Sequence, residues 1–224
     1  ICGTDSEEIP VSLEGNSDSF RMKLSFLPNG NCVILPNING RGYGFFKITE
    51  GESSGLWSVL RSSEDEVLKG SLLITLYENL RWKTISPQGF REEMLAYLPN
   101  ESNSLLFSMA LSYLGDCQRI FPSDSCPLEE ALWKIVTTNP VSQHRLQAFR
   151  LYRSIADSEE AVQRLYTLWQ ERKAPKDCTL SESDYIGLSY MLAMHLPEKA
   201  DKIIATQLSR IQNPDRKKEY QFIS

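Results

Sequence analysis

Two histidines, five cysteines and a few clusters of charged residues are the side chains that could carry chemistry in this sequence. His144 lies in SQHRLQAF and His195 in MLAMHLPEK; neither belongs to an HExxH motif or has another metal ligand at a suitable spacing. We therefore assign no metal ligand. We interpret His144 as part of a polar helix face and His195 as a half-buried residue at a helix end.

The cysteines are widely spread and contain no CxxC pair, which fits neither a disulfide framework nor a zinc ribbon. A cysteine and histidine nucleophile pair has no local motif to support it. We expect small buried residues or free thiols, with a Cys117 to Cys126 bridge as the alternative if the protein is exported. The five positions are Cys2, Cys32, Cys117, Cys126 and Cys178.

Clustered charges are the remaining candidates. The acidic residues 64–66 stand where a helix is expected to begin, so we interpret them as a solvated helix cap. Arg145, Arg150 and Arg153 share one expected helix and could present a basic face to a carboxylate ligand, although surface salt links are the favoured interpretation. The basic residues 216–218 are flanked by acidic ones and indicate a solvated first turn. No catalytic, cofactor-binding or metal-binding residue is assigned.

Composition excludes several classes of partner. The chain has 224 residues, 41% of them hydrophobic, which is enough for a substantial core. Its net charge of -5 argues against nucleic acid or an anionic membrane as the main partner. The sequence has no apolar run of about 20 residues and its start, ICGTDSEEIP, does not resemble a secretory signal. We expect a soluble protein, cytoplasmic or periplasmic, and a fragment of a longer chain.

Residues 1–52 show the alternation of short strands. SFRMKLSF places Phe20, Met22, Leu24 and Phe26 on one face, and IPVSLEG and CVILP are shorter versions of the same pattern. Gly42 begins GYGFFKIT, which could open a glycine-rich phosphate loop. The aromatic residues that follow favour a strand after a tight turn instead.

From residue 55 onward the apolar residues recur at helical spacing, and we expect eight helices. Capping patterns at Ser63 with Glu66, Asp157 with Glu160 and Ser181 with Asp184 begin three of them, and Ser86-Pro87 begins another. Tyr220, Phe222 and Ile223 indicate a further apolar stripe whose packing partner we expect after Ser224. The apolar faces of the eight helices include Leu68, Leu72, Leu76 and Leu80; Phe90, Met94 and Leu98; Leu105, Met109 and Tyr113 beside Leu106, Ala110 and Leu114; Leu128, Leu132 and Val136; Ala148, Leu151 and Tyr152; Val162, Leu165 and Trp169; Tyr185, Leu188 and Leu192; and Ile203, Ile204 and Leu208. The tryptophans Trp57, Trp82, Trp133 and Trp169 are expected in the core.

The predicted fold class is therefore mostly α: a short antiparallel β-sandwich segment, immunoglobulin-like and partial, over residues 1–52, followed by an irregular α-α superhelix over residues 55–224. Short connections marked by proline or glycine favour antiparallel neighbouring helices. The order resembles HEAT or armadillo repeats, although no fixed sequence period is present.

The order of IPVSL, VILPNINGRGYGFFKIT, LWSVL and ISPQGF resembles the junction between the β-sandwich and the C-terminal helical domain in zinc aminopeptidases of the aminopeptidase N family. Asn39-Gly40 and residues 42–46 are similar to the Asn-Gly and aromatic strand that end the family's sandwich. Residues 210–216 resemble a helix junction of bacterial members. The resemblance covers nearly the whole chain.

The resemblance implies the non-catalytic C-terminal portion of a metallopeptidase, a hydrolase, which caps the active-site cleft and shapes peptide access. Zinc would belong to the parent protein, bound in a preceding catalytic domain of the same chain by an HExxH motif and a later Glu, none of which occurs here. Lys69 and Gly70 also stand where the family commonly has an arginine. Two alternatives stay open: a freestanding helical-repeat adaptor, or an inactive aminopeptidase relative used for binding.

Overall fold

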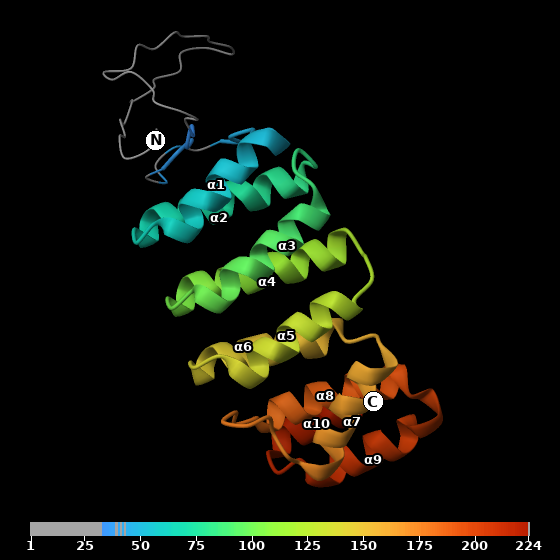
Figure 1. Ribbon diagram of the computed structural model, residues 1–224. Helices are drawn as coiled ribbons and strands as arrows, with labels where there is room; N and C mark the ends of the chain where they lie inside the picture. The colour runs from blue at the N-terminus through green and yellow to red at the C-terminus, as the bar shows by residue number, and fades with distance from the viewer. Residues whose placement is uncertain (1–32, 39, 41, 43, 224) are drawn as a thin grey trace, which may run out of the picture. The chain divides into compact units, whose positions relative to one another are not determined.

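The computed structural model describes residues 33–38, 40, 42 and 44–223 (Figure 1). This part of the chain is mostly helical and contains no strand. It divides into two compact units, residues 1–86 and 87–224. None of the helices described is long and apolar enough to cross a membrane.

The first unit contains α1 (Glu50–Ser62) and α2 (Glu66–Arg81). The second contains α3 (Pro87–Tyr97), the short 3-10 helix η1 (Leu98–Asn100), α4 (Ser104–Ile120), α5 (Cys126–Thr138), α6 (Ser142–Ile155), α7 (Glu159–Glu171), α8 (Glu182–His195), η2 (Pro197–Lys199), α9 (Ala200–Arg210) and α10 (Pro214–Ile223). The eight helices expected from the sequence correspond to α2 through α9.

The prediction of a strand over GYGFFKIT is wrong for those of its residues that the structure describes. The prediction of a strand over CVILP is wrong for its described residues too. Side chains, not a neighbouring strand, satisfy this backbone. Asn37 accepts a hydrogen bond from Gly42 N (2.6 Å) and donates one to Gly42 O (3.1 Å). Asn79 of α2 donates to Phe46 O (2.8 Å) and accepts from Ile48 N (2.9 Å). The segments IPVSLEG and SFRMKLSF lie outside the described residues.

Helix α1 begins at Glu50, inside the range assigned to the β-segment. Its N-cap is Thr49, which forms a capping box with Glu52. Two other caps differ from the prediction. Asp65, not Ser63, caps α2 by accepting from Val67 N and Leu68 N, because Ser63 ends α1.

Ser158, not Asp157, caps α7 by accepting from Ala161 N at 3.2 Å. The capping box of Ser181 with Asp184 is confirmed at the start of α8. Pro87 is the first residue of α3, as the Ser86-Pro87 pair predicted. The local start signals therefore located these helices to within two residues.

In the second unit, helices adjacent in sequence pack on one another: α3 with α4, α5 with α6, α7 with α8, and α8 with α9. Further contacts join α4 to α6 and α6 to α8. Figure 1 shows α3 beside α4 and α5 beside α6 along most of their length. The core contains Phe90, Phe107 and Phe149, each at most 1% exposed, and leucines of the predicted faces such as those of α2. Of the stripe predicted on α4, Leu106 and Leu114 are buried, but Leu105 is 75% exposed, so the expectation for Leu105 is wrong.

Two sequence expectations about packing are wrong in part. Tyr220 is expected to lack its partner, but it is 1% exposed; its hydroxyl lies 2.8 Å from Ser189 Oγ and its ring stacks on Tyr190, so this residue already has its partner in α8. Phe222 and Ile223 are exposed, and for these two residues the expected packing partner stays a prediction. Among the tryptophans, Trp57 and Trp169 are buried as expected, but Trp82 is exposed and Trp133 half-exposed.

Replacing Asn79 with alanine is expected to destabilise the protein by about 2 to 4 kcal/mol, because Phe46 O and Ile48 N would lose their partner in a buried site. Urea denaturation followed by circular dichroism measures this change. Asn100→Ala is the matched control: Asn100 is exposed and its amide makes one 3.4 Å bond to Ala96 O. Equal stability of the two variants would contradict the role of Asn79.

Candidate functional site

A shallow open groove lies between α5 and α7 and the loop that follows α7. It has a volume of about 440 Å³, and a second hollow of about 590 Å³ continues it along α7. Both are lined by Arg164 and Thr167. The first is also lined by Trp133, Thr137, Leu168, Glu171, Lys173, Ala174, Pro175 and Lys176, and the second by Glu159, Glu160 and Gln163.

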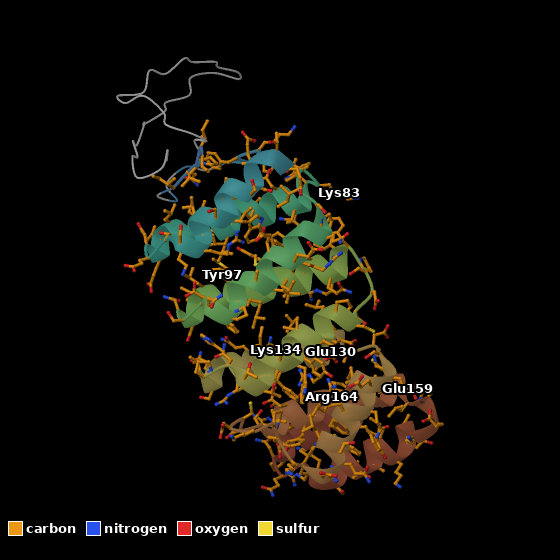
Figure 2. The ribbon with its side chains drawn as sticks, viewed as in Figure 1. Lys83, Tyr97, Glu130, Lys134, Glu159 and Arg164 are labelled. Carbon is orange, nitrogen blue, oxygen red and sulfur yellow. The ribbon has the colours of Figure 1, made fainter. Side chains whose placement is uncertain are left out.

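Arg164 is the organising residue of this groove. Its guanidinium donates to Tyr152 Oη (2.9 Å) and Glu160 Oε1 (2.7 Å) and lies 3.7 Å from Glu130 Oε1. Its Cζ stands 4.8 Å from the centre of the Trp133 ring. Figure 2 shows Arg164 and Glu159 on α7, with Glu130 and Lys134 on α5. The guanidinium is therefore held in place by an aromatic face and by groups from three helices.

The groove combines an aromatic ring, hydroxyls and charges of both signs. The carboxylates of Glu130 and Glu160 are 65% and 75% exposed, so a ligand can reach them and the edge of Arg164. Such a surface can recognise an extended peptide through side-chain and backbone hydrogen bonds.

His144 occupies a different place from the one expected. It is fully buried and stacks on Phe107 of α4, with ring centres 4.0 Å apart. Its Nε2 lies 3.1 Å from Ser104 Oγ, while its Nδ1 is buried without a hydrogen-bond partner. Burial lowers the pKa of His144, against the opposing charge of Glu101. The expected polar helix face is therefore wrong: His144 belongs to the contact between α4 and α6.

A buried carboxyl group lies at the turn from α3 to α4. Glu101 is 4% exposed, accepts from Asn103 N at 2.7 Å and accepts a hydrogen bond from the hydroxyl of Tyr97. Burial, and then the Glu101 bond and charge, raise the pKa of Tyr97. These hydrogen bonds fix the connection from α3 through η1 to α4, so the role of this cluster is structural.

The arginines of α6 form salt links, as the favoured interpretation had it. Arg150 donates to both carboxylate oxygens of Asp184 (2.8 and 3.2 Å), and Arg153 donates to Asp184 O (3.1 Å). Arg145 pairs with Asp177 at 3.3 Å. Burial alone would raise the pKa of Asp184, but its hydrogen bonds with Arg150 and Ser181 bring it down to about 2. These cations tie α6 to α8 and to the loop before it.

The other sequence candidates are dispersed. The acidic residues 64–66 are exposed around the cap of α2, and Arg216 pairs with Glu182 at 3.3 Å in the first turn of α10. His195 ends α8 and lies 3.9 Å from Asp157. Cys117, Cys126 and Cys178 are free, so the alternative of a bridge from Cys117 to Cys126 is not formed. Among the described residues, no three histidine, cysteine or carboxylate side chains form a group that could hold a metal ion.

Sequence reasoning missed the groove because Trp133 and Arg164 are far apart in the chain and neither belongs to a motif. The burial of His144 did have a signal: His144, Ala148 and Tyr152 recur at four-residue spacing and all are buried. No protein-family profile matches the chain, and no curated protein or solved structure is significantly similar to it.

Asp184→Asn is expected to lower the free energy of unfolding by about 2 kcal/mol at pH 7, with little difference from the unsubstituted protein near pH 2. The lowered folded pKa means that the stabilisation is present above the unfolded value near 4 and is lost as pH falls toward 2. Urea titrations at a series of pH values measure it, with Asp201→Asn on the exposed face of α9 as control. A difference between the variants that does not depend on pH would contradict the ionic role.

His144 is expected to make the protein sensitive to mild acid. Because its folded pKa is below the unfolded value, the unfolded chain takes up the proton first and stability falls as pH drops below about 6.5. His144→Phe keeps the ring stacked on Phe107 and removes the titration. Melting temperatures between pH 7.5 and 5 should therefore fall less in this variant than in His195→Phe, whose histidine is exposed. Identical pH profiles would contradict the expectation.

Proposed function

We propose that this chain is the non-catalytic C-terminal portion of a zinc metallo-aminopeptidase, in which it caps the active-site cleft and shapes the access of peptide substrates. The observation that carries the proposal is the packing of helices that follow one another in sequence: α3 with α4, α5 with α6, α7 with α8 and α8 with α9. Paired helices in sequence order present extended surfaces on which a chain can bind. The groove organised by Arg164 adds a surface of mixed charge that suits a peptide backbone.

The order of the segments supports this assignment. The stretch that resembles the end of the family's sandwich, residues 39–46, is followed directly by the helices, as in the C-terminal half of an aminopeptidase. A helical cap needs shape and surface groups, and its partners would be the N-terminal catalytic domain of the same chain and the peptide substrate.

In the parent, zinc would supply the chemistry by activating water for attack on the N-terminal peptide bond. The role proposed for this chain is to bind and orient the peptide outside that site. Trp133 offers an apolar face, and the exposed carboxylates of Glu130 and Glu160 offer partners for a peptide amine or a basic side chain.

A freestanding helical adaptor is the second candidate, and one observation favours it. The described residues from Gly44 to Thr49, which the resemblance makes part of a strand, form no strand and instead bond to Asn79 of their own unit. A segment held in this way needs no neighbouring sheet. An inactive aminopeptidase relative used for binding would share the cap but have an altered ligand set upstream.

The coding sequence upstream of Ile1 tests the proposal. It is expected to encode an HExxH motif and a later Glu, and the protein made from the whole gene is expected to bind about one zinc ion and to hydrolyse aminoacyl reporter substrates. Residues 1–224 alone, purified in the same way, are the control and are expected to do neither. Metal analysis and a fluorogenic assay measure both properties.

Each contrary result selects an alternative. A start codon directly before Ile1 would favour the adaptor. An upstream region that has lost a histidine or the Glu of the motif would favour the inactive relative. Tightly bound zinc in residues 1–224 alone would contradict all three interpretations, because none of them gives this chain a metal site.

A further inference from the structure

The groove beside α7 carries opposite charge at its two ends. At the start of α7, Glu159 and Glu160 line one hollow, and Glu130 of α5 lies 3.7 Å from the guanidinium of Arg164. All three of these glutamates are exposed. Arg164 is the one cation among the described residues that line this hollow, so negative charge is in excess here.

Positive charge is in excess at the other end. Lys173 and Lys176, from the loop after α7, line the same groove together with Glu171, and both lysines are exposed. Helix α7 is followed by Arg172 in the left-handed conformation (φ 54°), which allows the chain to turn sharply. The loop after this turn brings both lysines to the groove.

The loop that carries these lysines is held in place. Cys178 N donates to Pro175 O (3.0 Å), and Pro175 is itself buried. Asp177 pairs with Arg145 of α6 at 3.3 Å, which ties the loop to a neighbouring helix. The basic end of the groove is therefore formed before a ligand binds, and less ordering entropy is lost on binding.

The spacing of the groove residues sets the length of a matching ligand. At 1.5 Å per residue, Glu160 and Lys173 are about 20 Å apart along the axis of α7, and seven residues of an extended peptide span the same distance. The side chains of its first, third, fifth and seventh residues share one face. Arg164, with the Trp133 ring 4.8 Å away, lies about 6 Å from Glu160 along the axis, which is the position of the third residue.

We propose that this groove selects extended peptides in which a basic and an acidic residue stand about six positions apart, with an apolar residue about two positions from the basic one. The basic side chain pairs with Glu159 and Glu160, the apolar side chain contacts the ring of Trp133, and the acidic side chain pairs with Lys173 and Lys176. Exposed ion pairs are weak one by one, so selection requires both ends together. This inference rests on the peptide-binding role proposed above and adds which peptides are bound.

Titration of residues 1–224 with short peptides tests the selection. The probe is acetyl-Arg-Ser-Leu-Ser-Ser-Ser-Glu-amide, used also in the reversed order because side-chain charge does not depend on the direction of the backbone. The comparison peptides have arginine at both ends or glutamate at both ends. The readout is the NMR signal of the Trp133 indole N–H group, assigned with Trp133→Phe. We expect the better of the two mixed peptides to bind at least about fivefold tighter than either comparison peptide, and the difference to shrink in about 0.5 M salt.

Reversing the charge of one end of the groove gives a second readout. Lys173→Glu combined with Lys176→Glu is expected to remove the preference for the mixed peptide and to make the peptide with two arginines the tighter ligand. Lys202→Glu combined with Lys218→Glu is the matched control, because it changes the net charge equally at exposed positions of α9 and α10. The preference of this control should equal that of the unsubstituted protein. Circular dichroism checks that both variants keep their helices.

Three results would overturn the inference: mixed peptides that bind no tighter than the comparison peptides, a preference that survives the reversal at Lys173 and Lys176, or no change of the Trp133 signal with any peptide. Equal binding of all the peptides would remove the charge pattern and leave peptide capture by the groove intact. The proposed function is decided separately, by the coding sequence upstream of Ile1 and by the zinc content and activity of the protein made from the whole gene.

Discussion

The residues just before an α-helix carry backbone N–H groups that the helix itself does not bond, and in this protein a carboxylate from another element accepts from several of them. Glu129 of α5 is the clearest case: it is 2% exposed and accepts from Asp157 N (2.8 Å), Ser158 N (3.2 Å) and the hydroxyl of Ser158 at the start of α7. Burial raises the pKa of Glu129, but these hydrogen bonds outweigh it and lower the pKa. One buried carboxylate thus fixes where α7 begins relative to α5, and with it the groove that lies between them.

A carboxylate accepts from a backbone N–H group ahead of two other helices. Glu50 Oε2 of α1 accepts from Ser86 N (2.6 Å), and Glu182 Oε2 of α8 accepts from Gln212 N (2.8 Å) ahead of α10. Asn79 does the equivalent for an extended segment. Apolar stripes hold the helices together but are tolerant of sliding, whereas a carboxylate that must meet a particular N–H allows one register. The register between neighbouring helices therefore depends on these few polar contacts.

This division explains what the sequence could predict. Helices α2 through α9 were predictable because the 3.6-residue recurrence of leucines such as Leu72, Leu76 and Leu80 is a local signal. The conformation of the described part of residues 1–52 was not predictable. Alternation in GYGFFKIT predicts a strand, but the residue that decides the conformation of this segment, Asn79, lies more than thirty residues away. The groove depends in the same way on Arg164 meeting Trp133 and Tyr152 from two other helices. What sequence reasoning lacks is knowledge of which distant polar group reaches which backbone.

The approach of α6 to α8 carries a consequence for substitutions at one position of α8. A Cβ atom on Gly187 would lie 2.5 Å from Arg153 Nη1, so the guanidinium fills the space that a side chain at position 187 would need. Because the guanidinium is the far end of a flexible side chain, a larger residue at position 187 is accommodated by moving it, at the cost of its hydrogen bond to Asp184 O. The effect of a substitution at position 187 therefore depends on which residue stands at position 153, although the two positions lie on different helices.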